Sequence, residues 1–374
     1  MEELFITCPH YFESLLLQEL KYLGIKKLRQ GFCGVYAPAD MDTVYTVNYC
    51  SRIATRVLYP LMRFACPNKE SLYSMVKRIP WTKYLTTEMT FAIDANVNHP
   101  LLKNSLYAAL VVKDAICDFF RDKTGLRPSV DIHNPDVQLN LFIQKGQATL
   151  YFDTSGAPLH KRGWRLENTE ATLHESLAAG LLMQCGFRPG MSLCDPFCGS
   201  GTFLVEAAMI STQTPAGYFR KNWGFEKHPL FHVEEWNSVK AHFNAKISCL
   251  TQGQIFGADK DYEAFKTCYK HLKATSFRDS IHLENTDILS YNPSAIPNIV
   301  ICNPPYGKRL ELTAAVSLGL KQFIENKCDG STKVYVLTSD ASMVKKLGKE
   351  FKEEIHFKNG GMSVALYRLF LKPA

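Results

Sequence analysis

The run with the clearest chemical meaning in this chain is NPPYG, which begins at Asn303 and follows the apolar segment 298–302. Two consecutive prolines lack backbone donors and hold the turn extended, so its carbonyl oxygens stay available as acceptors. The Asn303 side-chain oxygen and the Pro304 carbonyl can together accept both N–H groups of an exocyclic amine on a nucleic-acid base. Pro305 keeps the turn rigid, and Tyr306 offers a face on which the base can stack. The alternative is a proline-rich turn with a packed tyrosine.

A second run, DPFCGSGTF from Asp195 to Phe203, follows another apolar strand-like segment and opens a helical pattern near Thr202. Gly199 and Gly201 carry no Cβ, so a cofactor can lie against the backbone beside free amides of the helix N-terminus. On its own this G-x-G pattern also fits an ordinary tight turn. Leu204 stands where the dinucleotide fingerprint needs its third glycine, which argues against NAD.

Two further acids follow strand-like segments in the same half of the chain. Asp259 ends IFGAD and Asp287 lies in NTDIL. A carboxylate at such a position can accept both hydroxyls of a ribose, although an acid after a strand is also a common helix N-cap. Because ligands of doubly wound sheets bind at the carboxyl ends of the strands, we expect Asp195, Asp259 and Asp287 to lie along one sheet edge.

The elements that position these residues alternate between strand and helix from residue 156 onward. The strand segments SLCDPF, QIFGAD, IHLENTD, NIVICNPP and KVYVLTSD are nearly all apolar, as expected where helices cover both faces of a parallel sheet. The chain then closes with two β-runs joined at Lys358 to Gly361, a plausible hairpin turn. We predict an α/β, Rossmann-like domain over 156–374 that ends in an antiparallel hairpin.

The first part of the chain has α+β character and no catalytic pattern. Over residues 1–65 the pattern predicts a strand at 4–8, a helix, a second strand at GVYAP and a second helix that begins near Asp40 or Asp42. Over 66–155 the pattern predicts a helix near 72–79, a strand at 90–97, a long amphipathic helix at 106–120, and three strands in VDIHN, QLNLFI and ATLYFDTS. We therefore predict two small α+β units before the Rossmann-like domain.

Bulk composition narrows the class of protein. The chain has 374 residues, 46% of them hydrophobic and 21% charged, which fits a folded protein of two or three domains. A net charge of +7 suits an anionic partner such as RNA. The 12 cysteines include no CxxC pair, so we expect no metal site. We see no signal peptide or membrane-spanning segment, and expect a cytoplasmic protein without a membrane partner.

Taken in order, DPFCGSGTF, Asp259, TDIL and NPPYG resemble the motifs of class I S-adenosylmethionine-dependent N-methyltransferases. Four further strings indicate a more specific family: SGAPLHKRGWR, ATLHESLAAGLL, KNSLYAALVVKDAICD and RPSVDIHNPDVQLNL. Together they resemble bacterial 23S ribosomal RNA guanine-N2 methyltransferases with an N-terminal ferredoxin-like piece and a THUMP RNA-binding domain. The likeness implies a ferredoxin-like unit at 1–65, a THUMP-like domain at 66–155 and a methyltransferase domain at 156–374. The family usually has proline where Thr172 stands, and no fused second methyltransferase domain is expected.

The resemblance also implies roles for individual residues. Its target-base role falls on Asn303, Pro304, Pro305 and Tyr306. Its S-adenosylmethionine site falls on Asp195, Phe197, Gly199, Gly201, Thr202, Asp259, Asp287 and Asn303, with Thr172 and Glu175 in a loop that closes over the cofactor. From their residue types, Lys161, Arg162, Trp164 and Arg165 suit phosphate contact and base stacking, although a solvated turn with a packed Trp164 is equally plausible. The long excursion 214–232 suits substrate contact.

The expected reaction is an in-line methyl transfer to guanine N2 of a base flipped out of its stack, without a metal or a covalent enzyme intermediate. Cys198 and Cys302 raise the alternative of a cysteine nucleophile, which the acceptor-rich NPPY turn argues against. A transfer RNA guanine-N2 methyltransferase remains an alternative of the same class. A non-catalytic RNA-binding assembly factor is the alternative of a different class.

Overall fold

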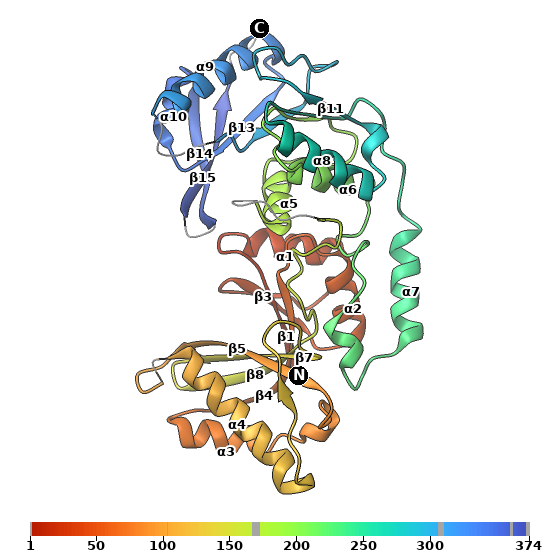
Figure 1. Cartoon of the computed structure of the whole chain (residues 1–374), viewed down its shortest axis with the longest axis vertical. Helices are drawn as coiled ribbons and strands as arrows, with labels where there is room; N and C mark the ends of the chain where they lie inside the picture. Colours follow the sequence, from red (N-terminus) through yellow and green to blue (C-terminus); the bar gives the residue numbers. More distant parts are fainter. Residues whose placement is uncertain (1, 103, 167–172, 306–309, 360–361, 372–374) are drawn as a thin grey trace. The chain divides into compact units, whose positions relative to one another are not determined.

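A computed structural model of the chain describes residues 2–102, 104–166, 173–305, 310–359 and 362–371. Contacts between Cα atoms divide the chain into two compact units, which we describe separately (Figure 1). The first comprises residues 1–9, 16–159 and 221–241, and the second comprises 10–15, 160–220 and 242–374.

The first unit is built on one eight-stranded sheet with the order β2-β3-β1-β4-β8-β7-β5-β6. Its strands are β1 (Glu3–Thr7), β2 (Arg29–Gly31), β3 (Gly34–Pro38), β4 (Arg56–Ala65), β5 (Thr90–Asn98), β6 (Ser129–Val130), β7 (Val137–Gln144) and β8 (Gln147–Asp153). Its helices are α1 (Glu13–Tyr22, divided between the units), α2 (Met41–Cys50), α3 (Lys69–Lys77), α4 (Ser105–Thr124) and α7 (Val233–Asn244, of which residues up to 241 belong here), with short 3-10 turns at Trp81–Lys83 and Gly224–Lys227.

Within the first unit, strand β4 belongs to both of the small α+β units that the sequence predicts, over residues 1–65 and 66–155. Its first three residues pair with β1, where Val57 lies opposite Ile6, and the strand pairs with β8 from Leu58 opposite Asp153 to Ala65 opposite Gln147. The predicted boundary at residue 65 therefore coincides with the end of a strand that belongs to both units. The two N-terminal units share one continuous sheet in place of two separate ones.

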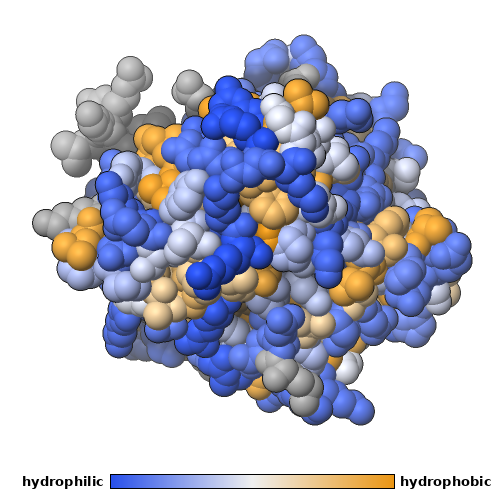
Figure 2. Space-filling model, turned by 90° about the horizontal axis from the view of Figure 1, so that it is seen from below, coloured by the Kyte–Doolittle hydropathy of each residue, from blue (hydrophilic) through white to orange (hydrophobic). Residues whose placement is uncertain are grey.

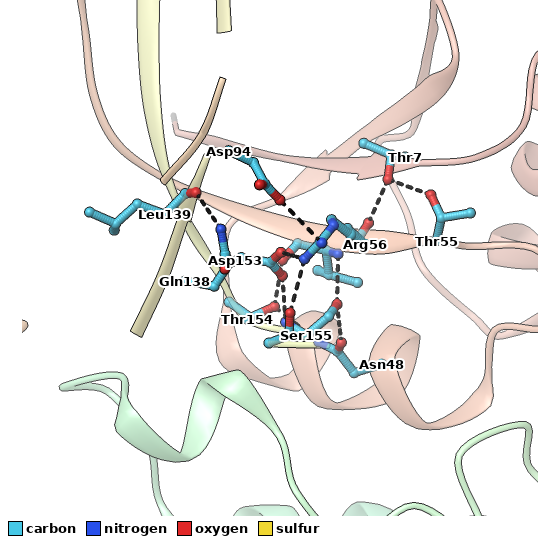
Figure 3. A network of polar contacts seen from close by, with 12 residues as sticks. Thr7, Asn48, Thr55, Arg56, Asp94, Gln138, Leu139, Asp153, Thr154 and Ser155 are labelled. Carbon is cyan, nitrogen blue, oxygen red and sulfur yellow. Dashed lines mark hydrogen bonds and ion pairs between the residues drawn. The ribbon is translucent and has the colours of Figure 1, made fainter. Parts of the chain in front are cut away.

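A buried polar network fastens this junction (Figure 3). The Arg56 guanidinium donates to the Asp153 carboxylate, to the Gly156 carbonyl at 2.9 Å and to Asp94 on β5 at 3.2 Å. Asp153 is fully buried, and burial raises its pKa while Arg56 opposes that rise. Because a buried carboxylate is stable when it is paired and hydrogen-bonded, Arg56 fixes the end of β8 against β4 and β5.

The core of the THUMP-like half lies between the sheet and the pair α3 and α4, which Figure 1 shows along one side of β4, β8 and β5. On β7 the residues Leu139, Leu141 and Ile143 are fully buried in this core. The predicted strand at VDIHN is wrong beyond Val130, because the Asp131 side chain accepts the backbone N–H groups of His133 and Asn134 and turns the chain there.

Residues 221–241 pack into the first unit although they follow the glycine-rich run in sequence. Phe225 lies 5.1 Å from Tyr45 and Trp236 lies 5.3 Å from Tyr49, measured between ring centroids. Trp223 stacks on Phe225 at 5.6 Å. This part of the predicted excursion therefore has its large aromatic side chains in a packed cluster, where they stabilise the first unit and are not free for substrate.

The second unit is an α/β domain on a seven-stranded sheet with the order β11-β10-β9-β12-β13-β15-β14. Its strands are β9 (Leu193–Asp195), β10 (Ile255–Asp259), β11 (Ile281–Asn285), β12 (Ile299–Cys302), β13 (Lys333–Thr338), β14 (Glu350–Asn359) and β15 (Met362–Phe370). Its other elements are α5 (Glu175–Gln184), α6 (Thr202–Ser211), α8 (Tyr262–Ala274), α9 (Leu310–Lys327), α10 (Ala341–Lys346) and a 3-10 turn at Arg278–Ser280.

Strands β11, β10, β9, β12 and β13 run parallel, and β15 is inserted antiparallel between β13 and β14. The sequence prediction of a parallel sheet that ends in an antiparallel hairpin is confirmed, although the hairpin turn at 360–361 lies outside the described residues. The carboxyl ends of β9, β10 and β12 consequently meet at one edge, and each predicted chemical motif begins there.

Among the described helices, none is long and apolar enough to cross a membrane. The face of the molecule shown in Figure 2 is mostly hydrophilic, with hydrophobic residues in small separate patches. Nowhere in the described ranges do three or more His, Cys, Asp or Glu side chains gather where they could hold a metal ion.

Candidate active site

Three neighbouring parallel strands bring Asp195, Asp259 and Asn303 to one sheet edge. In the register of the sheet, Gly257 of β10 lies opposite Asp195 at the end of β9, and Ile299 of β12 lies opposite Leu193. Asp259 therefore ends its strand two residues beyond Asp195, and Asn303 directly follows β12. This is the edge at which open α/β sheets bind ligands.

The Asp259 carboxylate is tied to the glycine-rich loop. Its Oδ2 accepts the backbone N–H of Gly199 at 2.8 Å, and its Oδ1 accepts the backbone N–H of Asp261 at 2.9 Å. The N-cap of helix α8 is Asp261, whose side chain accepts the N–H groups of Glu263 and Ala264. The alternative that Asp259 is merely the cap of the next helix is thus wrong, since Asp261 fills that place.

Gly199 and Gly201 both adopt a backbone conformation that favours glycine, but their surroundings differ. Both have a positive φ, 53° at Gly199 and 82° at Gly201, which favours glycine. A Cβ on Gly199 would face open space, as a position beside a ligand requires. A Cβ on Gly201 would lie 2.4 Å from the sulfur of Cys268, so Gly201 is required for packing against α8. The predicted close approach of a cofactor therefore has structural support at Gly199, but not at Gly201.

Asp195 is almost fully buried at the start of this loop. Its Oδ1 accepts the backbone N–H of Phe197 at 3.1 Å, which shapes the first turn of the loop. Burial, together with the nearby Asp259 carboxylate, raises the pKa of Asp195 well above its ordinary value. A strongly perturbed pKa of this kind is common among ionisable groups at functional sites.

Asn303 presents a buried acceptor without a partner. Its side-chain Oδ1 is shielded from solvent and accepts no hydrogen bond from any residue in the described part of the chain. Because leaving a buried polar atom unpaired costs about 1–3 kcal/mol, such an atom suggests a missing partner. Next to it Pro304 is buried and Pro305 is exposed. Tyr306 lies outside the described residues, as does Thr172.

Asp287 and Thr202, two of the predicted cofactor contacts, lie after strand β11 and at the start of helix α6. Asp287 follows β11 by two residues, and its Oδ1 accepts the backbone N–H of Leu289 at 3.1 Å. Its side chain is 47% exposed, and Lys260 lies 4.0 Å away. Thr202 is buried at the first position of α6, directly after the positive-φ Gly201. Their predicted cofactor contacts remain predictions.

Arg165 is bound to the glycine-rich loop that contains Gly199 and Gly201. Its Nε donates to Glu175 at 2.7 Å, its Nη1 to Ser200 Oγ at 3.1 Å and its Nη2 to Thr202 Oγ1 at 2.9 Å. The side chains of Arg165 and Glu175 are only 10% and 4% exposed. The charge expected to meet phosphate is therefore used to hold the glycine loop against the N-terminus of α5.

The other predicted RNA contacts of this segment also need correction. Arg162 is 2% exposed and forms an ion pair with the buried Glu206 of α6 at 3.4 Å. Trp164 is 1% exposed and packs 5.4 Å from the ring of His271. Neither side chain offers a surface to RNA, so both serve packing. Lys161 is exposed and remains a predicted contact.

Sequence reasoning missed the groups that receive these contacts. His271 Nδ1 lies 3.0 Å from the Ser200 carbonyl, so the middle residue of the GSG turn is held from two sides, by Arg165 and by His271. Nothing in the sequence marks the pairing, because 106 residues separate Arg165 from His271 and the residue types alone allow many partners.

The buried cysteines do not suit a nucleophilic role. Burial raises the pKa of Cys302 well above its ordinary value, and a hydrogen bond with Cys268 together with burial does the same for Cys198. Since the thiolate is the nucleophile, thiols held in the protonated form are poorly reactive. The preference for direct attack by an amine thus gains physical support.

A parallel sheet closed by an antiparallel hairpin, with a glycine loop after its first strand and an acid after its second, defines an S-adenosylmethionine-dependent class I methyltransferase. Residues 162–368 match the family described as RMKL-like, methyltransferase domain, and the chain belongs to this family. Residues 66–153 match the THUMP domain, and residues 3–58 match the RlmL ferredoxin-like domain. The resemblance inferred from the sequence motifs is confirmed.

Curated relatives agree with this assignment. A Synechocystis protein whose name proposes an RNA methyltransferase is 32% identical over 367 residues, which cover 97% of this chain and 95% of the relative. Ribosomal RNA large subunit methyltransferase K/L of Pseudomonas aeruginosa is 33% identical over 385 residues. That match covers 99% of this chain, which spans only 53% of the Pseudomonas protein.

Solved structures share the fold across the whole chain. The methyltransferase SMU.472, solved in a complex with SAH, has a TM-score of 0.85 at 24% identity, with 100% of this chain and 99% of that chain covered. A Listeria monocytogenes protein to which an N6-adenine-specific DNA methylase activity is ascribed has a TM-score of 0.84 at 25% identity, with 100% and 96% covered.

Proposed function

We propose that this chain transfers the methyl group of S-adenosylmethionine to the exocyclic N2 of a guanine in 23S ribosomal RNA, in the cytoplasm. The observation that carries the proposal is the buried, unpartnered Oδ1 of Asn303 at the carboxyl end of β12. An amine N–H is the donor that this acceptor lacks. The name of the K/L relatives supports RNA as the substrate, as does the match to a THUMP domain.

The residues present fit the cofactor. Gly199 leaves room beside the backbone, and Asp195 and Asp259 supply carboxylates at the same edge for the polar groups of a nucleoside and an amino acid. S-adenosylmethionine, when bound, supplies a methyl group on a positively charged sulfur. Arg165 keeps the glycine loop in position through Ser200 and Thr202.

Asn303 and Pro304 hold the amine and orient it. With its two N–H groups bound by the Asn303 side-chain oxygen and the Pro304 carbonyl, the nitrogen lone pair is free to attack in line. As the nitrogen–carbon bond forms, the bond from that carbon to the sulfonium sulfur would break, with its electron pair left on sulfur. Positive charge develops on the nitrogen during attack, two oxygen acceptors stabilise that charge, and one of the two amine protons is then released to water. The base must leave its stack to reach a turn at the sheet edge, as in other enzymes that modify bases.

Three other outcomes compete with this proposal. The acceptors of Asn303 and Pro304 would equally bind the exocyclic amine of adenine, which is the activity ascribed to the Listeria relative. A transfer RNA guanine-N2 methyltransferase would use the same groups. A non-catalytic RNA-binding assembly factor would retain the fold without transferring a methyl group.

The test uses the purified full chain with isotopically labelled S-adenosylmethionine and three substrates prepared without the modification: 23S ribosomal RNA, total transfer RNA and DNA. Digestion to nucleosides followed by mass spectrometry identifies the methylated base. We expect N2-methylguanosine from 23S ribosomal RNA alone and far less of this product with Asn303→Ala. Label in N6-methyladenine, or in transfer RNA, would replace the proposal by the corresponding alternative. Cofactor binding without product on any substrate would favour the non-catalytic factor.

A further inference from the structure

The eight-stranded sheet of the first unit has a cavity of about 430 Å³ on the face opposite α3 and α4. We call this face the open face and define it by Tyr36 on β3, Phe142 on β7 and Tyr151 on β8, all three of which line the cavity. Side chains alternate between the faces of a strand, so these rings point away from the core residues Leu141 and Ile143. The volume lies in the range of small-ligand sites.

The cavity spans both N-terminal modules. In the register of the sheet, Arg63 of β4 lies opposite Thr149 of β8, which lies opposite Phe142 of β7. Arg29 and Tyr36 line the cavity from β2 and β3 of the ferredoxin-like part. Because β4 runs through both modules, the two walls are held by one sheet and form a fixed pocket.

Phe142 is the one aromatic side chain that β7 places on the open face, where it contributes nothing to the hydrophobic core. The other open-face positions of this strand carry amide side chains, with Gln138 and Asn140 half-buried and Gln144 exposed. A half-buried phenylalanine among them lies outside the hydrophobic core of the unit. An aromatic side chain at the wall of a polar pocket is the usual surface for base stacking.

Tyr36 and Tyr151 supply two more rings with fixed positions. The Arg29 guanidinium lies 3.9 Å from the Tyr36 ring centroid and donates to Glu3 at 2.7 Å, so this cation is stacked and paired. Tyr151 is 6% exposed, and burial raises its pKa to about 12, which keeps the phenol neutral near pH 7. Both tyrosine rings therefore offer flat, uncharged surfaces, and the cation beside Tyr36 is paired with Glu3.

The charges of the cavity favour a base over a phosphate. Arg29 and Arg63 are matched by the carboxylates of Glu2 and Glu3, so the lining has no excess of cations to attract a phosphate backbone. The carboxylates of the lining and the amides of Gln144 and Gln147 can instead bind the N–H and carbonyl groups on the edge of a base. Sequence-specific contacts to RNA are commonly made with unpaired bases that stack on aromatic side chains of a sheet.

We propose that the cavity on the open face binds one unpaired nucleotide of the RNA substrate, with its base stacked on Phe142. The inference rests on the proposed function in so far as that function supplies RNA as the ligand. It adds a second recognition site, built from strands β2, β3, β4, β7 and β8, to the site at the carboxyl ends of β9, β10 and β12.

The experiment measures binding of the full chain to a fluorescein-labelled single-stranded RNA octamer of mixed sequence, by fluorescence anisotropy, with a blunt duplex of the same sequence for comparison. Phe142→Ala should weaken binding of the octamer about 5- to 100-fold, as expected for loss of one stacked base. Phe142→Tyr retains the ring and should bind within about twofold of wild type. The matched control is Tyr107→Ala, which removes an aromatic side chain that is 44% exposed on α4, and it should bind like wild type.

Several results would overturn the pocket. These are equal octamer affinity of Phe142→Ala and wild type, equal weakening by Tyr107→Ala, and no preference of wild type for the octamer over the duplex. Thermal unfolding of each variant ensures that a folding defect is not mistaken for lost binding. If Phe142→Ala unfolded, Phe142→Leu would replace it, since leucine fills the volume without an aromatic face.

Failure of the pocket and failure of the proposed function give different results. Wild-type protein that forms N2-methylguanosine while Phe142→Ala binds the octamer normally would leave the function standing and remove the pocket. If the wild-type protein methylated no RNA but the Phe142→Ala variant lost octamer binding, the pocket would stand and the proposed function would not.

Discussion

Arg165 and Glu175 form a nearly buried ion pair, with Arg165 Nε 2.7 Å from Glu175 Oε1, and the same guanidinium binds Ser200 and Thr202 of the glycine loop. The pair joins the end of the KRGWR run to the first residue of α5 and to the start of α6. The shape of the glycine loop therefore depends on a cation that lies 35 residues earlier in sequence than Ser200.

Replacing Arg165 by alanine should weaken binding of S-adenosylmethionine at least about tenfold, because the side chains of Ser200 and Thr202 lose their common donor. The protein should also lose stability, by about 3–5 kcal/mol if the Glu175 carboxylate is left buried and unpaired. Isothermal titration calorimetry and thermal unfolding measure the two effects. Arg165→Ala combined with Glu175→Gln removes the unpaired charge and should recover stability without recovering affinity.

Lys161→Ala is the matched control, since it removes an exposed cation from the same run. It should leave cofactor affinity and stability unchanged and weaken RNA binding modestly, with a smaller dependence on salt. If Arg165→Ala bound the cofactor as tightly as Lys161→Ala does, the guanidinium would have no part in shaping the loop.

The division between what the sequence predicts and what it misses follows from the range of the interactions. The apolar strands of the parallel sheet and the start of α6 depend on local pattern, and the structure confirms them. The partners of Arg162 and Trp164 lie on helices α6 and α8, which are distant in sequence. A run of cations beside a tryptophan looks alike whether it faces RNA or a buried glutamate.

Domain limits show the same dependence on long-range contacts. The sequence divides the chain at residues 65 and 155, where the pattern of elements changes. In the structure β4 ends at the first limit but is shared by the sheets of both sides, and residues 221–241 pack with the aromatic side chains Tyr45 and Tyr49. Such packing depends on which aromatic clusters meet in space, which hydrophobic periodicity does not encode.

Substitution of Asp259 tests the predicted cofactor site. Asp259→Ala should weaken S-adenosylmethionine binding by about 1.5–3 kcal/mol, the value for lost hydrogen bonds to a charged group. The loss includes the bond from Gly199, which positions the loop. Asp261→Ala removes a nearby carboxylate that caps α8, so it should lower stability by about 1 kcal/mol and leave the affinity unchanged. Equal dissociation constants for wild type and Asp259→Ala would assign the acid to loop structure alone.

Asn303 tests the chemistry apart from cofactor binding. Asn303→Ala should lower turnover at least about 100-fold and change cofactor affinity only a few-fold, because the lost acceptor acts on the amine. Single-turnover methyl transfer and calorimetry on the same preparation separate the two quantities. Asn292→Ala changes an exposed asparagine that binds Lys327, and it should behave like wild type in both assays. Wild-type turnover in Asn303→Ala would remove Asn303 from the site.

His228 gives the first unit a dependence on pH. Its ring is packed between aromatic side chains, 4.6 Å from Tyr59 and 5.0 Å from Phe152, and its Nδ1 accepts the backbone N–H of Leu230 at 3.2 Å. No described residue bonds to its buried Nε2. Burial lowers the pKa of His228 to about 4, against about 6.5 for an unperturbed histidine.

Between pH 6.5 and 4 the unfolded chain therefore binds a proton that folded His228 does not, so stability falls as pH falls through this window and is fully present above it. This one group should make the first unit about 2 kcal/mol less stable at pH 5 than at pH 7. Urea unfolding at both pH values, with tryptophan fluorescence and with His228→Phe for comparison, isolates the contribution, since other groups titrate equally in both proteins. The variant should show a smaller difference between the two pH values than wild type. If both proteins lost the same stability between pH 7 and pH 5, His228 would bind its proton as readily in the folded state as in the unfolded chain.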